Sequence, residues 1–359
     1  YGKLDSLSQL ALTLFFLHRE LKSKETDRET NSAKSASLAS FSSFNVRRQM
    51  SNGGTDRSKI SQHNASAGCF AALLSDYQEM LVHTIRPSGD KLDWSTVRDL
   101  RLPFWLRSDE KLRQISEEVG QQMYRDSKDI LKSAIFFVVA GKKRTLMNLA
   151  AADNTDSGKK FYKFLSGYDF SSDRGRSAAE KNAFSLLRKN KYESAAAFFL
   201  LAEPPILKSA VETIATKMED LDLAFLVARL VGNSSPSPVA NGGLGMTSGF
   251  GGVLGGGGGY AGSGTAVVEV TKDDYGFKDW KRSLSVIAKR LILDRCLPTA
   301  QDDSCFSALL LLWLGRFDEA SHWLTGLISG MNDVVPRFVE DVSVPQLKSL
   351  RSIGRNSRG

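Results

Sequence analysis

The stretch that decides the fold is SDRGRSAAEKNAFSLLRKNKYESAAAFFLLAEPP, residues 172–205. Its first half places small and apolar side chains at helical spacing and ends in the polar turn Lys189–Lys191. A second apolar helix follows from Tyr192 and stops at Pro204–Pro205, because proline lacks the amide hydrogen that a helix interior needs. Two helices of about a dozen residues joined by a short turn form an antiparallel helical hairpin.

Other parts of the chain repeat this design. Residues 207–230 predict a second pair of helices with a turn near Glu219–Asp220, and helical spacing also follows the N-cap residue Ser108. A weak internal echo links residues 191–195, KYESA, to residues 316–320, RFDEA. Hairpins that cannot bury a face alone stack into a solenoid with a continuous core. The sequence therefore predicts an all-α fold, a helical-hairpin α-solenoid with long disordered or flexible insertions; a pair of unrelated helical bundles is the alternative.

Changes of composition divide the chain into six parts. Of the 30 glycines, 14 fall between Gly232 and Gly264, which is typical of a flexible insertion. Residues 22–66 are rich in Ser, Thr, Asn and charged residues and lack periodicity, as a disordered loop does. The expected parts are a helix of a preceding array (1–21), a disordered Ser-rich loop (22–66), the α-solenoid core (67–231), a Gly-rich flexible insertion (232–270), a continuation of the solenoid (271–330) and a poorly ordered tail (331–359).

The composition excludes several classes of protein. With 359 residues, 42% of them hydrophobic, the chain can bury a core. Three cysteines cannot form a disulfide framework, which favours a reducing compartment, and no apolar run approaches the ~20 residues of a transmembrane helix. The chain begins with Tyr1 and lacks a basic leader, so we expect a soluble piece of a longer protein. Its net charge of +8 fits a nucleic acid, an acidic membrane, an acidic protein partner or a merely solvated surface.

Motifs for catalysis or metal binding are weak or missing. Residues 257–262, GGGYAG, fit the letters G-x-G-x-x-G, but no strand precedes them, and so many neighbouring glycines make a chance match expected. The sequence has no G-x-x-x-x-G-K-[ST], no C-x-x-C and no H-E-x-x-H. The spacing of Cys296, Cys305 and His322 fits no common zinc site. We therefore expect no catalytic residue, no cofactor, no metal and no enzyme activity.

Four residues of the aromatic stretch 94–107 form a candidate binding site. Trp94, Phe104, Trp105 and Arg107 combine aromatic rings with a cation, and residues of these types are enriched at the centres of protein interfaces. We interpret them as a candidate partner-binding patch. The alternative is that they belong to the core and close one end of the solenoid.

Several stretches resemble the rabconnectin and DmX-like family. They are LDWS at 92–95, FWLRS at 104–108, KNAFSLL at 181–187, AAAFFLLA at 195–202 and LDLAFLVARL at 221–230. The resemblance is strong over residues 92–231, weaker over 277–327, and absent from 22–66 and from the Gly-rich stretch. The fungal member of this family is the large subunit of the RAVE complex, a regulator of vacuolar and endosomal V-type ATPase assembly.

The resemblance implies a function. Similar proteins are large and cytosolic, carry WD-repeat propellers before an α-solenoid, and promote assembly of the peripheral sector of the V-type ATPase onto its membrane sector. By this resemblance we expect a non-catalytic scaffold segment that binds peripheral-sector subunits and a Skp-type adaptor. It would be cytoplasmic and recruited peripherally, through partners, to endosomal or vacuolar membranes, without binding nucleic acid. A vesicle-coat or tethering solenoid of endosomal traffic is the alternative, and a nucleic-acid-binding helical repeat is a third hypothesis that rests on charge alone.

Overall fold

The structure is a computed structural model and describes residues 5–39, 53–86, 92–233 and 284–330. Within these ranges it contains helices and no strand, which confirms the predicted all-α fold. The helices are α1 (Ser6–Ala39), α2 (Gly53–Leu74), α3 (Gln78–Ile85), α4 (Trp94–Asp99), α5 (Leu102–Trp105), α6 (Asp109–Ser127), α7 (Ile130–Val139), α8 (Lys143–Ala152), α9 (Asp156–Gly167), α10 (Asp173–Arg188), α11 (Tyr192–Leu201), α12 (Leu207–Lys217), α13 (Leu221–Leu230), α14 (Val286–Leu291), the π-helical turn η2 (Ile292–Cys296), α15 (Leu297–Thr299), α16 (Ser304–Trp313) and α17 (Phe317–Gly330).

The predicted hairpin at 172–205 is present as α10 and α11. The Ser172 hydroxyl caps α10 by accepting a hydrogen bond from the Gly175 amide at 3.1 Å, and Asn190 in the turn adopts a left-handed backbone with φ +56°. Gly175 is required by a close approach, because a Cβ there would lie 1.9 Å from the Asp169 carbonyl oxygen. The helices α12 and α13 form the second predicted pair, and their turn includes Glu219 at φ +54°.

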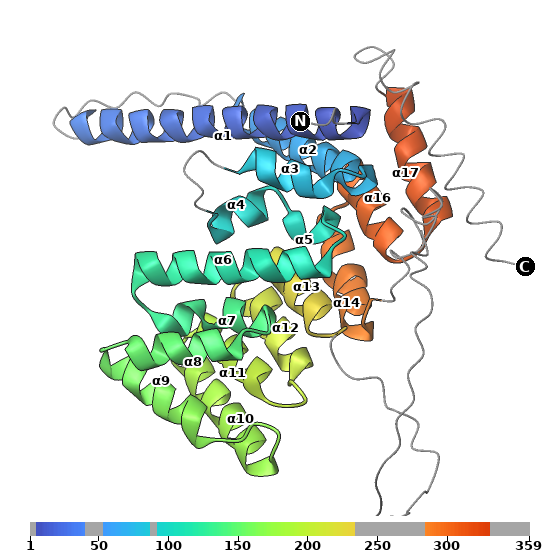
Figure 1. Cartoon of the computed structure of the whole chain (residues 1–359). Helices are drawn as coiled ribbons and strands as arrows, with labels where there is room; N and C mark the ends of the chain where they lie inside the picture. The colour runs from blue at the N-terminus through green and yellow to red at the C-terminus, as the bar shows by residue number, and fades with distance from the viewer. Residues whose placement is uncertain (1–4, 40–52, 87–91, 234–283, 331–359) are drawn as a thin grey trace, which may run out of the picture.

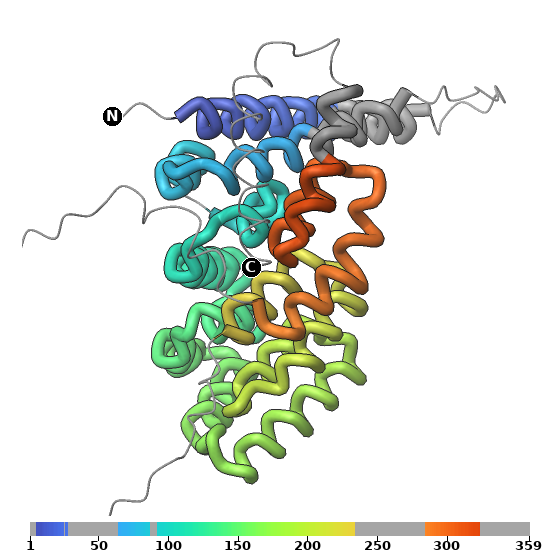
Figure 2. Tube along the Cα trace, turned by 90° about the vertical axis from the view of Figure 1, so that its right-hand side faces the viewer, coloured from blue at the N-terminus to red at the C-terminus, as the bar shows by residue number. Residues whose placement is uncertain are grey.

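The helices form a stack that the chain descends and then climbs again. Figure 1 shows α1 at one end and α9 with α10 at the other, and Figure 2 shows the early helices on one side and the late helices beside them. The late helix α16 packs against α2, and the Trp313 indole nitrogen donates to the Phe104 carbonyl oxygen at 2.6 Å. A continuation of the solenoid is expected over 271–330. From residue 284 on, where the structure describes it, this part packs back alongside the first helices.

The expected disordered loop at 22–66 needs correction, because α1 continues to Ala39 and α2 begins at Gly53. Lys, Glu, Arg and Ala are strong helix formers, so a segment without amphipathic spacing can still prolong a helix that is anchored at one end. The anchor of α1 is Phe15, which is fully buried and stacks 5.9 Å from the Trp105 ring. Residues 40–52 lie outside the described part.

Other expected segments also fall outside the described part. The Gly-rich insertion predicted at 232–270 is described only at Gly232 and Asn233, and the match at 257–262 is not described. The tail predicted at 331–359 lies outside as well. The two described flanks of residues 234–283 lie together, because the Ser285 hydroxyl donates to the Ala228 carbonyl oxygen at 3.0 Å.

Candidate functional site

The four residues of the predicted partner-binding patch do not form an exposed surface. Phe104 and Trp105 are 1% and 0% exposed, and the Trp105 indole nitrogen donates to the Leu100 carbonyl oxygen at 2.8 Å. Trp94 is half-buried and donates to an Asp220 carboxylate oxygen at 2.7 Å. The Arg107 guanidinium donates to the Ser75 carbonyl oxygen at 2.7 Å. The Phe104 and Trp105 rings belong to the core, as the alternative predicts, but α5 lies within the stack and does not close one of its ends (Figure 1).

A buried arginine on α13 binds the backbone of this stretch. Arg229 is 2% exposed, and its guanidinium donates to the carbonyl oxygens of Pro103 at 2.8 Å, Leu106 at 2.9 Å and Arg107 at 2.7 Å. Its Nε donates to the Asp109 carboxylate at 2.7 Å. Burial lowers the pKa of Arg229, and the Asp109 charge opposes that shift. The planar guanidinium thus supplies donors to carbonyls at the end of α5 and in its connection to α6.

One face of α13 contacts both the early helix α5 and the late helix α16, and so joins three segments of the stack. Asp222, Phe225 and Arg229 are spaced three and four residues apart, so they share that face. The Phe225 ring stacks on the Phe104 ring of α5 with centroids 4.4 Å apart. Arg229 also lies over the Trp313 ring of α16, 4.7 Å from its centroid. Early, middle and late helices therefore meet at α13.

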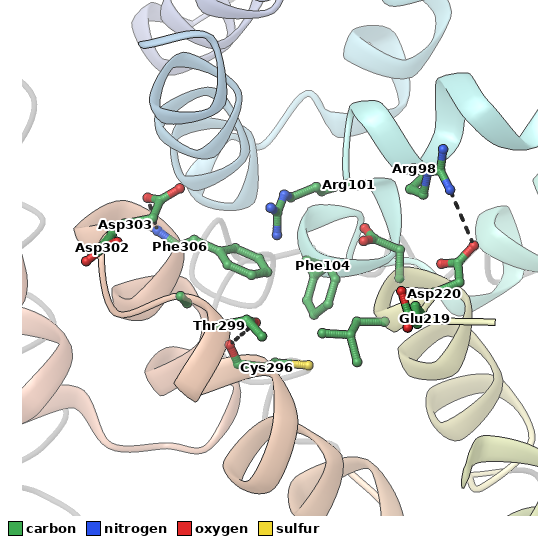
Figure 3. Close-up of a pocket in the computed structure, with 13 residues that line it drawn as sticks. Arg98, Arg101, Phe104, Glu219, Asp220, Cys296, Thr299, Asp302, Asp303 and Phe306 are labelled. Carbon is green, nitrogen blue, oxygen red and sulfur yellow. Dashed lines mark hydrogen bonds and ion pairs between the residues drawn. The ribbon is translucent and has the colours of Figure 1, made fainter. Parts of the chain in front are cut away.

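A polar cavity of about 360 Å³ opens at the end of this face (Figure 3). Three segments line it: the end of α4 and the start of α5 with two arginines, the α12–α13 turn with the start of α13, and the chain from η2 to α16. Its charged lining residues are Arg98, Arg101, Glu219, Asp220, Asp222, Asp302 and Asp303. Five carboxylates against two guanidiniums make the cavity acidic within a basic chain.

Three of these charged groups, Asp220, Asp303 and Arg101, already serve the packing. The Asp220 carboxylate accepts a hydrogen bond from the Leu223 amide at 2.9 Å, and the Asp303 carboxylate accepts one from the Phe306 amide at 3.0 Å, so each caps a helix. The Arg101 guanidinium lies over the Phe306 ring, 3.8 Å from its centroid. The cavity is thus built mainly from helix ends that are held in place.

Asp222 differs from these three groups. Its Oδ1 is fully covered and accepts no hydrogen bond from the residues that the structure describes. Desolvation by burial raises its pKa from 3.8 to about 7; Arg101 and Arg98 oppose the shift, and Asp220 and Asp99 add to it. A carboxyl with this pKa takes up or releases a proton near neutrality.

We predict that Asp222→Asn changes the pH dependence of stability. In the wild type the unfolded carboxyl ionises near pH 3.8 and the folded one near 7, so the folded state holds the extra proton between these values and stability falls as pH rises. The variant lacks this loss and should gain up to about 4 kcal/mol relative to wild type between pH 4 and 7, and no more above. Denaturant unfolding at a series of pH values measures it. A difference that does not change with pH would contradict the assignment.

The thiol and imidazole groups singled out in the sequence do not converge. Cys296 is buried at the cavity and Cys305 is half-buried, and desolvation by burial raises the pKa of each thiol to about 12, so both stay protonated at neutral pH. His322 is exposed on α17. Among the described residues, no group of three or more His, Cys, Asp or Glu side chains is placed to hold a metal ion.

Sequence reasoning missed Arg229 and Asp222, the two residues that matter most here. Both lie in the run LDLAFLVARL at 221–230, which predicts an apolar helix and carries part of the family resemblance but indicates no role for either charge. One signal in the sequence could have found them. Asp and Arg are seldom buried without a partner, so a charged residue inside an apolar run predicts a buried partner.

These features define the class of the protein: an all-α solenoid of stacked helical hairpins whose internal polar groups join its segments. No helix in the described ranges has the length and apolar character that a membrane crossing requires. A family model described as RAVE protein 1 C terminal matches residues 13–241, which is more than half of the chain. The chain belongs to this family.

Individual relatives agree with the family. The chain is 34% identical over 176 residues to DmX-like protein 1 of Mus musculus, covering 48% of this chain and 6% of that protein. It is 33% identical over 168 residues to regulator of V-ATPase in vacuolar membrane protein 1 of Saccharomyces cerevisiae, covering 46% and 12%, and 29% identical over 163 residues to the Schizosaccharomyces pombe protein of the same name, covering 44% and 12%. The chain thus spans about a tenth or less of the length of these relatives.

Proposed function

We propose that this chain is a non-catalytic scaffold segment of a V-type ATPase assembly factor. The observation that carries the proposal is the family match over residues 13–241, together with relatives named as regulators of V-ATPase in the vacuolar membrane. The matched range runs from α1 through the end of α13, so it includes the face of α13 at which the stack is joined.

The mechanism would be positional. A stack whose segments are tied by a buried arginine and by aromatic contacts presents several surfaces at fixed separations. Subunits that associate weakly in solution gain effective concentration when they bind neighbouring surfaces of one body, and no bond is made or broken. The proposal places the binding surfaces on the outside of the stack, because the polar groups of the interior already serve its packing.

The partners of this scaffold are peripheral-sector subunits of the ATPase and a Skp-type adaptor, the latter by family resemblance alone. Recruitment to the vacuolar or endosomal membrane follows from binding such partners. The protonated Cys296 thiol at the cavity and the helix-capping carboxylates of Asp220 and Asp303 support a scaffold over an enzyme, because a thiol that stays protonated is a poor nucleophile and these two carboxylates are already engaged.

Capture of ATPase subunits tests the proposal. The 359-residue chain, immobilised and checked for helical circular dichroism, is incubated with separated peripheral-sector and membrane-sector subunits of the ATPase. We expect retention of at least one peripheral-sector subunit, and loss of that retention when the immobilised chain is first unfolded by heat. Retention of no ATPase subunit by the folded chain would contradict the proposal, and capture of coat or tethering proteins from an extract would favour the vesicle-traffic alternative.

A further inference from the structure

The positive charge of the chain is concentrated at one end of the stack. Residues 156–191 hold nine Lys and Arg against four Asp and Glu, so five of the eight net positive charges fall on 36 residues. These residues form α9, α10 and the turn after it, which lie at the end of the stack farthest from α1 (Figure 1). The remaining residues of the chain are nearly neutral overall.

The lysines of α9 lie on its exposed side. Lys159, Lys160 and Lys163 are exposed, whereas Phe161, which points to the other side of the helix, is 3% exposed and packs against Phe198 with ring centroids 5.5 Å apart. None of the three lysines has an ion pair in the described part of the chain. Their charge is therefore available to an external ligand.

A hollow between α9 and the start of α10 gathers these cations. It has a volume of about 500 Å³ and is lined by Lys160, Lys163, Phe164, Gly167, Tyr168, Asp169, Ser172 and Arg174. Its one acid, Asp169, is engaged, because its carboxylate accepts hydrogen bonds from the Ser171 amide at 3.0 Å and the Ser171 hydroxyl at 2.7 Å. Ser172, the N-cap residue of α10, also lines the hollow, so the start of that helix borders it. Three cations and a helix start thus surround a space that a phosphate group would fit.

We propose that this end of the stack, defined by Lys159, Lys160, Lys163 and Arg174, binds the phosphate headgroups of an anionic lipid membrane directly. This goes beyond the scaffold function, in which partners alone bring the chain to the membrane.

A lipid surface fits these residues better than an acidic protein does. Three of the four cations are lysines, hydrated point charges on flexible stems, whereas protein interfaces favour desolvated arginine and buried aromatic anchors. Tyr162, 40% exposed beside the lysines, has the amphipathic ring that is enriched at membrane interfaces. The patch also lies at an extremity of the molecule, where a flat surface can approach it.

Vesicle sedimentation tests this inference. The whole chain is mixed with vesicles of phosphatidylcholine alone, of phosphatidylcholine with phosphatidylserine, and of phosphatidylcholine with a phosphoinositide. We expect sedimentation with the two anionic compositions, release by added salt, and none with phosphatidylcholine alone. The triple variant Lys160→Gln, Lys163→Gln, Arg174→Gln should lower the partition coefficient by about 100-fold, since each basic residue near an anionic surface contributes about a five-fold gain.

The matched control removes the same charge elsewhere. The control is a second triple variant with the substitutions Lys208→Gln, Lys217→Gln and Lys289→Gln, at exposed positions of α12 and α14. It should change the partition coefficient less than about five-fold. Three results would each overturn the proposal. They are an equal loss of vesicle binding in the two triple variants, equal sedimentation with neutral and anionic vesicles, and binding of polyglutamate or RNA without binding of vesicles. Since no ATPase subunit is present, the result is independent of subunit capture.

Discussion

Replacing Arg229 by methionine should destabilise the protein by about 3 to 5 kcal/mol, the cost of removing one side of a buried charged network. Methionine fills similar volume but cannot donate to the carbonyl oxygens of Pro103, Leu106 and Arg107, which would stay buried without a donor. The cation over the Trp313 ring would be lost as well. Guanidinium unfolding followed by helical circular dichroism measures the change.

Two further variants make this prediction specific. Arg229→Lys keeps the charge but lacks the planar fork, so it should lie between wild type and Arg229→Met. Arg290→Met removes an arginine whose side chain is 77% exposed and, among the described residues, forms an ion pair with Asp294; it should change stability by less than about 0.5 kcal/mol. If Arg229→Met and Arg290→Met cost the same, the buried guanidinium is not holding α13 to α5.

Phe104→Ala should cost about 3 to 5 kcal/mol, the usual range for deleting a buried phenyl ring. The ring stacks on Phe225 at 4.4 Å and meets the edge of Phe306 at 5.1 Å, so its removal opens a cavity between α5, α13 and α16 at once. Thermal or denaturant unfolding of the purified variant measures the loss.

This variant also decides between the two interpretations of the aromatic stretch. A ring that served only to bind a partner would leave stability unchanged when truncated. Phe16→Ala, which removes a ring that is 48% exposed on α1, is the control and should cost less than about 1 kcal/mol. Equal and small losses of stability in both variants would show that the Phe104 ring does not belong to the core.

The hairpins could be predicted from the sequence because local signals define them. Ser108 caps its helix as expected, and the turns at Lys189–Lys191 and Glu219–Asp220 lie where the apolar spacing stops. The length of α1 could not be predicted in this way. Its second half lacks an apolar face, and only helix propensity together with an anchored start prolongs it.

The joined face of α13 lay beyond prediction for a different reason. Arg229 receives its partners from residues more than 120 positions earlier, and Trp313 reaches a carbonyl 209 positions away, so no local pattern reports them. The raised pKa of Asp222 likewise depends on its burial in the folded stack, and Arg101, which opposes the shift, comes from another segment. The family resemblance placed the residues 104–108 and 221–230 among the family's characteristic stretches, but their contact with each other is visible only in three dimensions.

The return of α16 to the first helices also sets the order in which the core can close during synthesis. Phe104 and α2 are synthesised well before α16. After Phe104, another 209 residues must be added before Trp313, its partner on α16, is made. At about 5 to 20 residues per second, roughly 10 to 40 s pass in between. During that interval the aromatic side chains of α5 are not yet covered by α16. A nascent chain in this state exposes apolar surface to which chaperones bind.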